Sequence, residues 1–69
     1  MIVNIRKATD DEQLLYTINT DVIPREDDLV RINNLEDDSI EYAHVQAVRF
    51  NYVIIQWNNQ ILDSVDVFI

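Results

Sequence analysis

The stretch FNYVIIQWNNQILDSVDVFI, residues 50–69, carries the clearest structural signal in the sequence. Both of its halves alternate with a period of two, and β-branched and aromatic residues dominate them, as is typical of strands. The asparagine-rich WNNQ between the halves is typical of a tight hairpin turn. The stretch therefore predicts a β-hairpin, and we expect Trp57 and Phe50 to lie in the core.

The same alternation recurs along the rest of the chain. Between residues 40 and 50 its phase changes twice, which predicts a bulge or a strong bend in one long strand. We expect about five to six short antiparallel strands separated by turns, within one domain that covers residues 1–69. The predicted fold class is all-β, as a small SH3-like barrel or a sandwich.

Glycine is absent, so turns that need a positive φ must use another residue type. Asparagine and aspartate tolerate the left-handed region best. The pairs at 33–34 and 58–59, together with Asn51, are therefore the expected turn positions. Pro24 cannot donate to a ladder of hydrogen bonds, so it marks a strand end or a sheet edge.

The segment TDDEQLLY, residues 9–16, has two interpretations. Thr9 and Glu12 have the spacing of a capping box, and Asp10 and Asp11 would favour the positive end of a helix dipole. A single helical turn near 10–16 satisfies this pattern. The rival interpretation is the charged tip of a hairpin that joins strands at 2–7 and 13–20.

Length and composition limit the core. A chain of 69 residues buries only about 60% of the surface that its unfolded form exposes. There is no cysteine to form a disulfide or a thiolate metal site. Small domains without such support often rely on association, so a homodimer is compatible with the sequence.

The charge balance excludes several kinds of partner. Thirteen acidic residues stand against five basic ones, which gives a net charge of −8. Nucleic acid and anionic membranes repel such a surface, so we expect no direct contact with either. The start, MIVNIRK, lacks the pattern of a signal peptide, and no apolar run approaches the ~20 residues of a membrane span. We expect a cytoplasmic protein.

The sequence contains no recognisable catalytic, cofactor or metal site. Its acidic residues fall in consecutive clusters at 10–12, 26–28 and 36–41, whereas a calcium loop needs alternating ligands and a glycine. His44 has no serine in a nucleophile elbow to work with, so a packed or surface histidine on a strand is expected. The prediction is a protein that is not an enzyme.

The remaining candidates are binding residues. Acid clusters around a compact barrel can mimic the charge of phosphates and fit a basic protein surface. Tyr52 and Phe68 fall on the phase opposite to their strands' other apolar residues, so with Leu62 they could form an exposed apolar patch. The predicted partner-binding residues are Glu26, Asp27, Asp28, Glu36, Asp37, Asp38, Tyr52 and Phe68.

The order IPREDDLVRI, a strand that ends AVRFNY, then VIIQW and VDVFI, resembles small β-barrel proteins from phages and prophages of Gram-positive bacteria. The resemblance covers residues 22–69, and Asp27 stands where a glycine is common in those proteins. The spacing from Tyr42 to Val45 differs by one residue. The matching positions are structural: Pro24, Asp28, Val30, Tyr42, Val45, Val48 and Phe50. The resemblance implies a barrel without an active site that inhibits host enzymes or assembles with other proteins.

Two functional hypotheses follow. The first is a phage-type acidic inhibitor that covers a basic site on a host protein acting on nucleic acid, in the host cytoplasm. The second is a structural or assembly module that self-associates through its C-terminal hairpin. Both are protein-binding roles without catalysis.

Overall fold

The computed structural model describes residues 1–56 and 59–69, and within them it has six strands and no helix. The all-β prediction is confirmed, as is the number of strands. Trp57, predicted to lie in the core, falls outside the described residues. The strands are β1 (Ile2–Arg6), β2 (Leu14–Asn19), β3 (Leu29–Asn34), β4 (Ser39–His44), β5 (Ala47–Gln56) and β6 (Asn59–Phe68).

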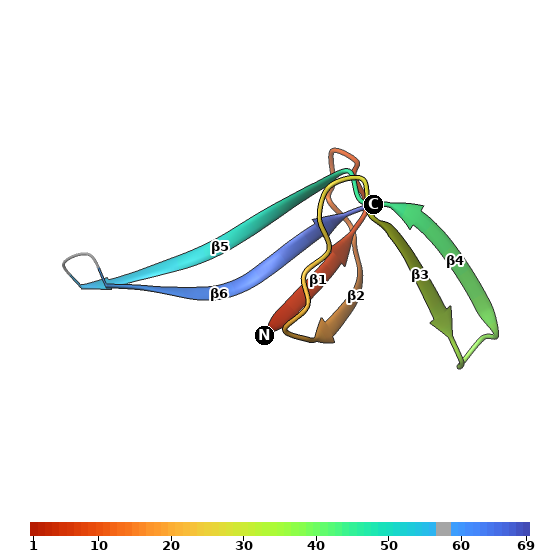
Figure 1. The fold of residues 1–69 in the computed structure, drawn as a ribbon, viewed down its shortest axis with the longest axis horizontal. Coiled ribbons are helices and arrows are strands. Elements are labelled where there is room, and N and C mark those ends of the chain that lie inside the picture. The colour runs from red at the N-terminus through yellow and green to blue at the C-terminus, as the bar shows by residue number, and fades with distance from the viewer. Residues whose placement is uncertain (57–58) are drawn as a thin grey trace.

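The strands form an open sheet and a separate hairpin, not a closed barrel (Figure 1). The sheet has the order β2-β1-β6-β5, and β3 pairs with β4 alone. Strand β1 runs parallel to β6, so the prediction of antiparallel strands is wrong for this pair. The other pairs are antiparallel, as predicted. The barrel prediction is wrong because, in the described part of the chain, no ladder joins the β3–β4 hairpin to either edge strand, β2 or β5.

The chain between β1 and β2 is a hairpin tip, and the predicted helical turn near 10–16 is wrong. The Lys7 N–H donates to the carbonyl of Gln13 at 2.9 Å, and the Glu12 N–H donates to the carbonyl of Thr9 at 3.0 Å. Glu12 has φ of 48°, which ends the turn instead of continuing it as a helix. Asp10 and Asp11 are exposed in this turn, whereas Glu12 is half-buried.

The phase changes predicted to mark a bulge within 40–50 mark a boundary between two strands. Strand β4 ends at His44, and β5 begins at Ala47. Between them, Val45 is 1% exposed and donates its N–H to the carbonyl of Asp28, while Gln46 donates to the carbonyl of Phe68. These bonds fix the point at which the chain passes from the hairpin to the sheet.

Among residues 1–56 and 59–69, three residues with positive φ take the place of the missing glycines. They are Glu12, Asp27 and Asp38, with φ values of 48°, 72° and 56°. Aspartate was one of the two residue types expected there, but asparagine was expected to supply the positions. The pair at 33–34 and Asn51 lie inside strands instead, and Asn58 lies outside the described residues. Asp27 occupies a left-handed position that glycine would adopt without strain.

The core lies between the sheet and the inner end of the β3–β4 hairpin. Val3 and Ile5 of β1 pair in register with Val65 and Val67 of β6, so their side chains share one face. Val45 completes this buried cluster. Around it pack the half-buried side chains of Tyr16, Ile23, Val30, Ile32, Val48, Leu62 and Ile69. Small β-branched side chains dominate the cluster, so the apolar area it removes from water is small.

Candidate functional site

Strands β5 and β6 extend well beyond the rest of the sheet and form an arm (Figure 1). Strand β1 pairs with β6 only from Ser64 to Phe68. The arm, defined as residues 52–56 and 59–62, therefore has two strands and no third strand beside them. An isolated two-stranded hairpin is marginally stable at best in water, so this arm needs support from elsewhere.

Apolar side chains lie on both faces of the arm. Tyr52 pairs with Leu62 on one face, and Val53 pairs with Ile61 on the other. Of these and their neighbours, the side chains that are about half exposed or more are Tyr52, Val53, Ile54, Ile55 and Ile61. A strand pair with one wet face normally alternates apolar with polar residues, whereas this arm exposes apolar side chains on both faces.

The surface area and dimensions of the chain also show that it buries less surface than a compact domain of its size. A compact monomer of 8.2 kDa has an accessible surface of about 4,500 Å², whereas this chain exposes 5332 Å². Its radius of gyration is 13.5 Å, against about 11 Å for a compact domain of this length. The longest dimension is 47 Å and the other two are 23 and 21 Å. The chain is therefore elongated and exposes more surface than a compact domain of its size.

An apolar groove lies at the other end of the molecule, between the sheet and the β3–β4 hairpin. Its volume is about 640 Å³. One wall carries Ile5, Tyr16 and Ile18 from β1 and β2. The opposite wall and rim carry Val30, Ile32, Leu35, Arg31, Glu36 and the asparagines at 33–34. The two walls face each other with apolar side chains, as in a site that receives an inserted group.

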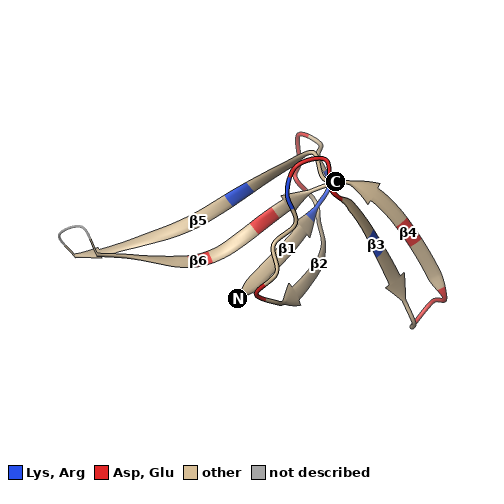
Figure 2. Ribbon diagram, viewed as in Figure 1, with Lys and Arg blue, Asp and Glu red and all other residues tan. Residues whose placement is uncertain are grey.

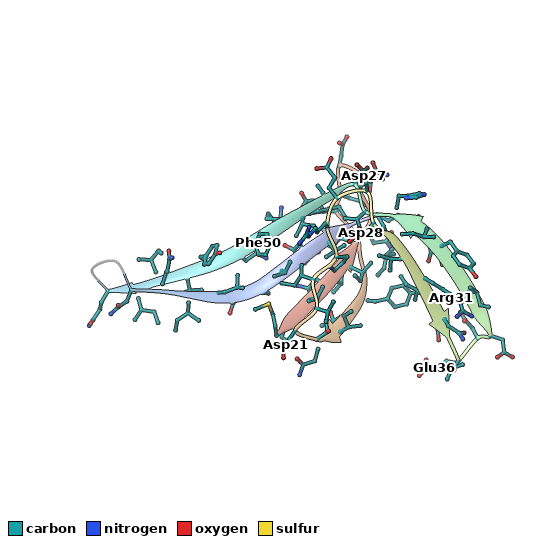
Figure 3. The ribbon with its side chains drawn as sticks, viewed as in Figure 1. Asp21, Asp27, Asp28, Arg31, Glu36 and Phe50 are labelled. Atoms are coloured by element: carbon teal, nitrogen blue, oxygen red, sulfur yellow. The ribbon has the colours of Figure 1, made fainter. Side chains whose placement is uncertain are left out.

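The predicted acidic residues are all exposed, but they do not form one cluster. Glu26, Asp27 and Asp28 precede β3, whereas Glu36, Asp37 and Asp38 lie in the turn after it. Asp27 and Glu36 are thus at opposite ends of the hairpin (Figure 3). Six residues of strand separate the two triplets by about 20 Å. The two triplets therefore form two separate patches of negative charge.

Two of these six carboxylates bind their own turns. Asp28 accepts a hydrogen bond from the N–H of Arg25 at 2.8 Å, and Asp37 accepts one from the N–H of Ser39 at 3.0 Å. Hydrogen bonds from Ser39 lower the pKa of Asp37. Both residues therefore shape the turns, which aspartate does well through such local bonds.

The two predicted aromatic anchors are separated. Tyr52 is exposed on the arm, but Phe68 is 9% exposed, so the prediction of an exposed patch that includes Phe68 is wrong. The Arg49 guanidinium carbon lies 5.1 Å from the centre of the Phe68 ring and covers it by a cation–π contact. Phe50, expected in the core, is 47% exposed because it lies on β5 toward the arm (Figure 3).

A buried carboxylate that the sequence did not reveal organises the other face of the sheet. Asp66 is 3% exposed. Its Oδ1 accepts hydrogen bonds from Asn4 Nδ2 and Arg6 Nε at 3.2 and 2.9 Å. Its Oδ2 accepts bonds from Arg49 Nε and Nη2 and from Asn51 Nδ2, at 3.1, 2.8 and 2.9 Å. The cluster ties β1 and β5 to β6 between them.

Further contacts extend this polar cluster to the β1–β2 hairpin. Arg49 Nη1 also binds the Glu12 carboxylate at 3.1 Å, and Arg6 Nη1 donates to the Glu12 carbonyl at 3.0 Å. Burial by itself would raise the pKa of Asp66, but hydrogen bonds from Asn51, Arg6, Arg49 and Asn4 lower it far below its usual range. The hydrogen bonds to Asp66 and Glu12 raise the pKa of Arg49. Asp66 is therefore a charged structural centre.

His44 lies on the surface of β4, as expected. Its Nδ1 is 3.3 Å from the carbonyl oxygen of Asp27, and the ring is exposed. His44 is not among the residues that line the groove. Among residues 1–56 and 59–69, no group of three or more histidine, aspartate or glutamate side chains is placed to hold a metal ion. The same residues include no helix long and apolar enough to cross a membrane.

Comparison of the chain with models of protein families, with curated proteins and with solved structures found no match.

Proposed function

We propose that this chain is a non-enzymatic protein-binding module that assembles with further copies of itself through the β5–β6 arm. The observation that carries the proposal is a two-stranded arm with apolar side chains exposed on both faces. Such an arm is marginally stable at best in water, because its apolar side chains stay exposed and its two strands have no neighbouring strand. A contact with another protein would bury the apolar side chains and place a neighbour beside the strands.

The charge distribution supports the arm as the contact. Residues 50–62 contain no charged side chain, although 26% of all residues are charged. Figure 2 shows neither basic (blue) nor acidic (red) residues in the outer part of the arm, whereas acidic residues lie in the turns of the rest of the chain. Two copies with a net charge of −8 repel each other. They approach at least cost through surfaces that carry no charge.

The test is sedimentation velocity on the unmodified chain and on Ile54→Glu. Ile54 is 64% exposed, so the substitution leaves the fold of the monomer intact. In a contact, it removes about 1.5–3 kcal/mol of apolar burial and buries a charge. We therefore expect the unmodified chain to associate between about 1 and 500 µM, and the variant to bind at least about 100-fold more weakly.

Val22→Glu is the matched control, because it makes the same kind of change at a more exposed residue outside the arm. It should associate like the unmodified chain. If the unmodified chain stays monomeric over the whole range, or both variants weaken association equally, the proposal is wrong.

The acidic inhibitor is a second candidate, and it stays a prediction. The observation that favours it is the exposure of all six predicted carboxylates at both ends of one hairpin. The sharpest variant changes Glu26→Gln, Asp27→Asn, Glu36→Gln and Asp38→Asn, and keeps the two aspartates that bind their own turns. Basic nucleic-acid-binding proteins captured from a lysate at low salt should be lost with this variant, because steering by charge weakens. Unchanged capture and unchanged salt dependence would refute it.

A further inference from the structure

We infer that the groove between the sheet and the β3–β4 hairpin receives the outer described part of the β5–β6 arm, residues 54–56 and 59–61, from a second copy of this chain. This inference rests on the proposed function and names the surface to which the arm binds. The arm and the groove both carry apolar surface that lacks a partner within the described chain. The proposal brings these two surfaces together.

The shapes are complementary. The arm is a thin ribbon with apolar side chains on both faces, represented by Ile54 on one and Val53 on the other. A flat surface would cover only one of these faces. The groove has two apolar walls, Ile18 on the sheet side and Leu35 on the hairpin side. A ribbon inserted between the walls buries both of its faces at once, which maximises the area removed from water.

The volume of the groove is sufficient for several side chains of the arm. A volume of about 640 Å³ lies within the roughly 300–1,000 Å³ typical of sites that enclose a compact ligand. Such a space accommodates a few side chains and leaves the base of the arm outside. The inserted part of the arm would also separate the exposed Ile18 and Leu35 side chains from water.

The charges favour a second copy as the occupant. The groove residues include one cation, Arg31, and one anion, Glu36, so the site is close to neutral in a strongly acidic protein. The arm carries no charge between residues 50 and 62. A basic peptide would gain little from such a groove, whereas an uncharged apolar ribbon enters it without leaving an unpaired charge.

The positions of the two surfaces permit the contact between copies. The arm extends from one end of the long axis, and the β3–β4 hairpin lies at the other end (Figure 1). The arm of a chain therefore points away from its own groove. Each copy offers an arm and accepts one, which is a heterologous contact that can be repeated from copy to copy.

Thiol cross-linking tests the inference, because the chain has no cysteine of its own. One chain carries Ile54→Cys, and a second, tagged chain carries Ile18→Cys or Leu35→Cys, one on each wall. Held together, the two thiols react at an effective concentration on the order of 1 mM, about 100-fold above a mixture at about 10 µM. We expect a short bismaleimide to join the arm to both wall positions about 100-fold faster than it joins thiols that meet by free collision.

Thr17→Cys is the matched control, because Thr17 lies beside Ile18 on the same strand and faces the opposite side of the sheet. The arm should join to this position only at the rate of free collision. Circular dichroism of each variant confirms the strand content, and Leu35, 79% exposed, tolerates replacement even if Ile18 does not.

The outcomes separate this inference from the proposed function. Joining of the arm to both walls above the Thr17 control supports the inference. Preferential joining of Ile54→Cys to Ile54→Cys of another chain overturns it and leaves assembly through the arm intact. Joining at the control rate throughout, with a monomeric unmodified chain, overturns both.

Discussion

Replacement of Asp66 by asparagine is expected to lower the free energy of unfolding by about 2–3 kcal/mol and the melting temperature by about 10–20 °C. The substitution keeps the shape of the side chain and removes its charge. Two guanidinium groups, from Arg6 and Arg49, then face a neutral amide. The amide also presents N–H donors to a site that supplies five donors already.

The size of this effect follows from burial. Removing one partner from a fully buried ion pair costs about 3–5 kcal/mol. The Arg6 and Arg49 side chains are 27% and 47% exposed, so in the variant they can turn toward water and recover part of that cost. The loss is still large for a chain whose single core contributes only about 3–5 kcal/mol.

Asp63→Asn is the control for this prediction. Asp63 lies on the same strand and is exposed, so it loses the same charge without losing buried hydrogen bonds. Its free energy of unfolding should change by no more than about 0.5 kcal/mol. Equal melting temperatures for the two variants would show that the cluster around Asp66 does not stabilise the fold.

The same residue predicts a dependence on pH. The pKa of Asp66 is lower in the folded chain than its ordinary value of 3.8, so the unfolded chain takes up a proton first as the pH falls. Its contribution to stability is therefore complete above that value and is lost progressively below it. A denaturation series at several pH values should show this acid-dependent loss in the unmodified chain and less of it in Asp66→Asn.

The two-residue alternation was sufficient to predict the all-β class and the number of strands, but it did not reveal the boundary between β4 and β5. It located the C-terminal hairpin, because Val53, Ile55, Val65 and Val67 lie in two runs around a turn. It did not predict how the strands join, because alternation is the same in parallel and antiparallel neighbours. The parallel pairing of β1 with β6 links the two ends of the chain, and such a contact leaves no local mark in the sequence.

The functional surfaces were harder to predict for a related reason. Asp66 alternates with Val65 and Val67 like any exposed strand residue, and its burial depends on donors from two other strands, β1 and β5. Phe68 looked exposed by phase but is covered by Arg49. The acid triplets were visible in the sequence, but the local bonds of Asp28 and Asp37 were not. The arm was visible only as a hairpin, because its isolation depends on the shorter length of β1.

The melting temperature of the unmodified chain is expected to rise with protein concentration, by about 5 °C for each tenfold increase. The reason is that assembly through the arm stabilises only the folded form, so association and folding are linked. The five residues of the buried cluster leave little stability to the isolated monomer. Differential scanning fluorimetry from about 1 to 100 µM measures the shift, which should total about 10 °C.

Ile54→Glu provides the comparison, because it removes the association and leaves the core of the monomer unchanged. Its melting temperature should be lower and should hardly vary with concentration. A melting temperature of the unmodified chain that stays constant over the range would mean that the monomer is stable by itself and that the arm needs no partner.

Assembly through the arm is tested most directly by sedimentation equilibrium of the unmodified chain between about 1 and 500 µM. We expect a mass that rises with concentration to a multiple of 8.2 kDa. A mass that stays at that of one chain at every concentration would contradict the account.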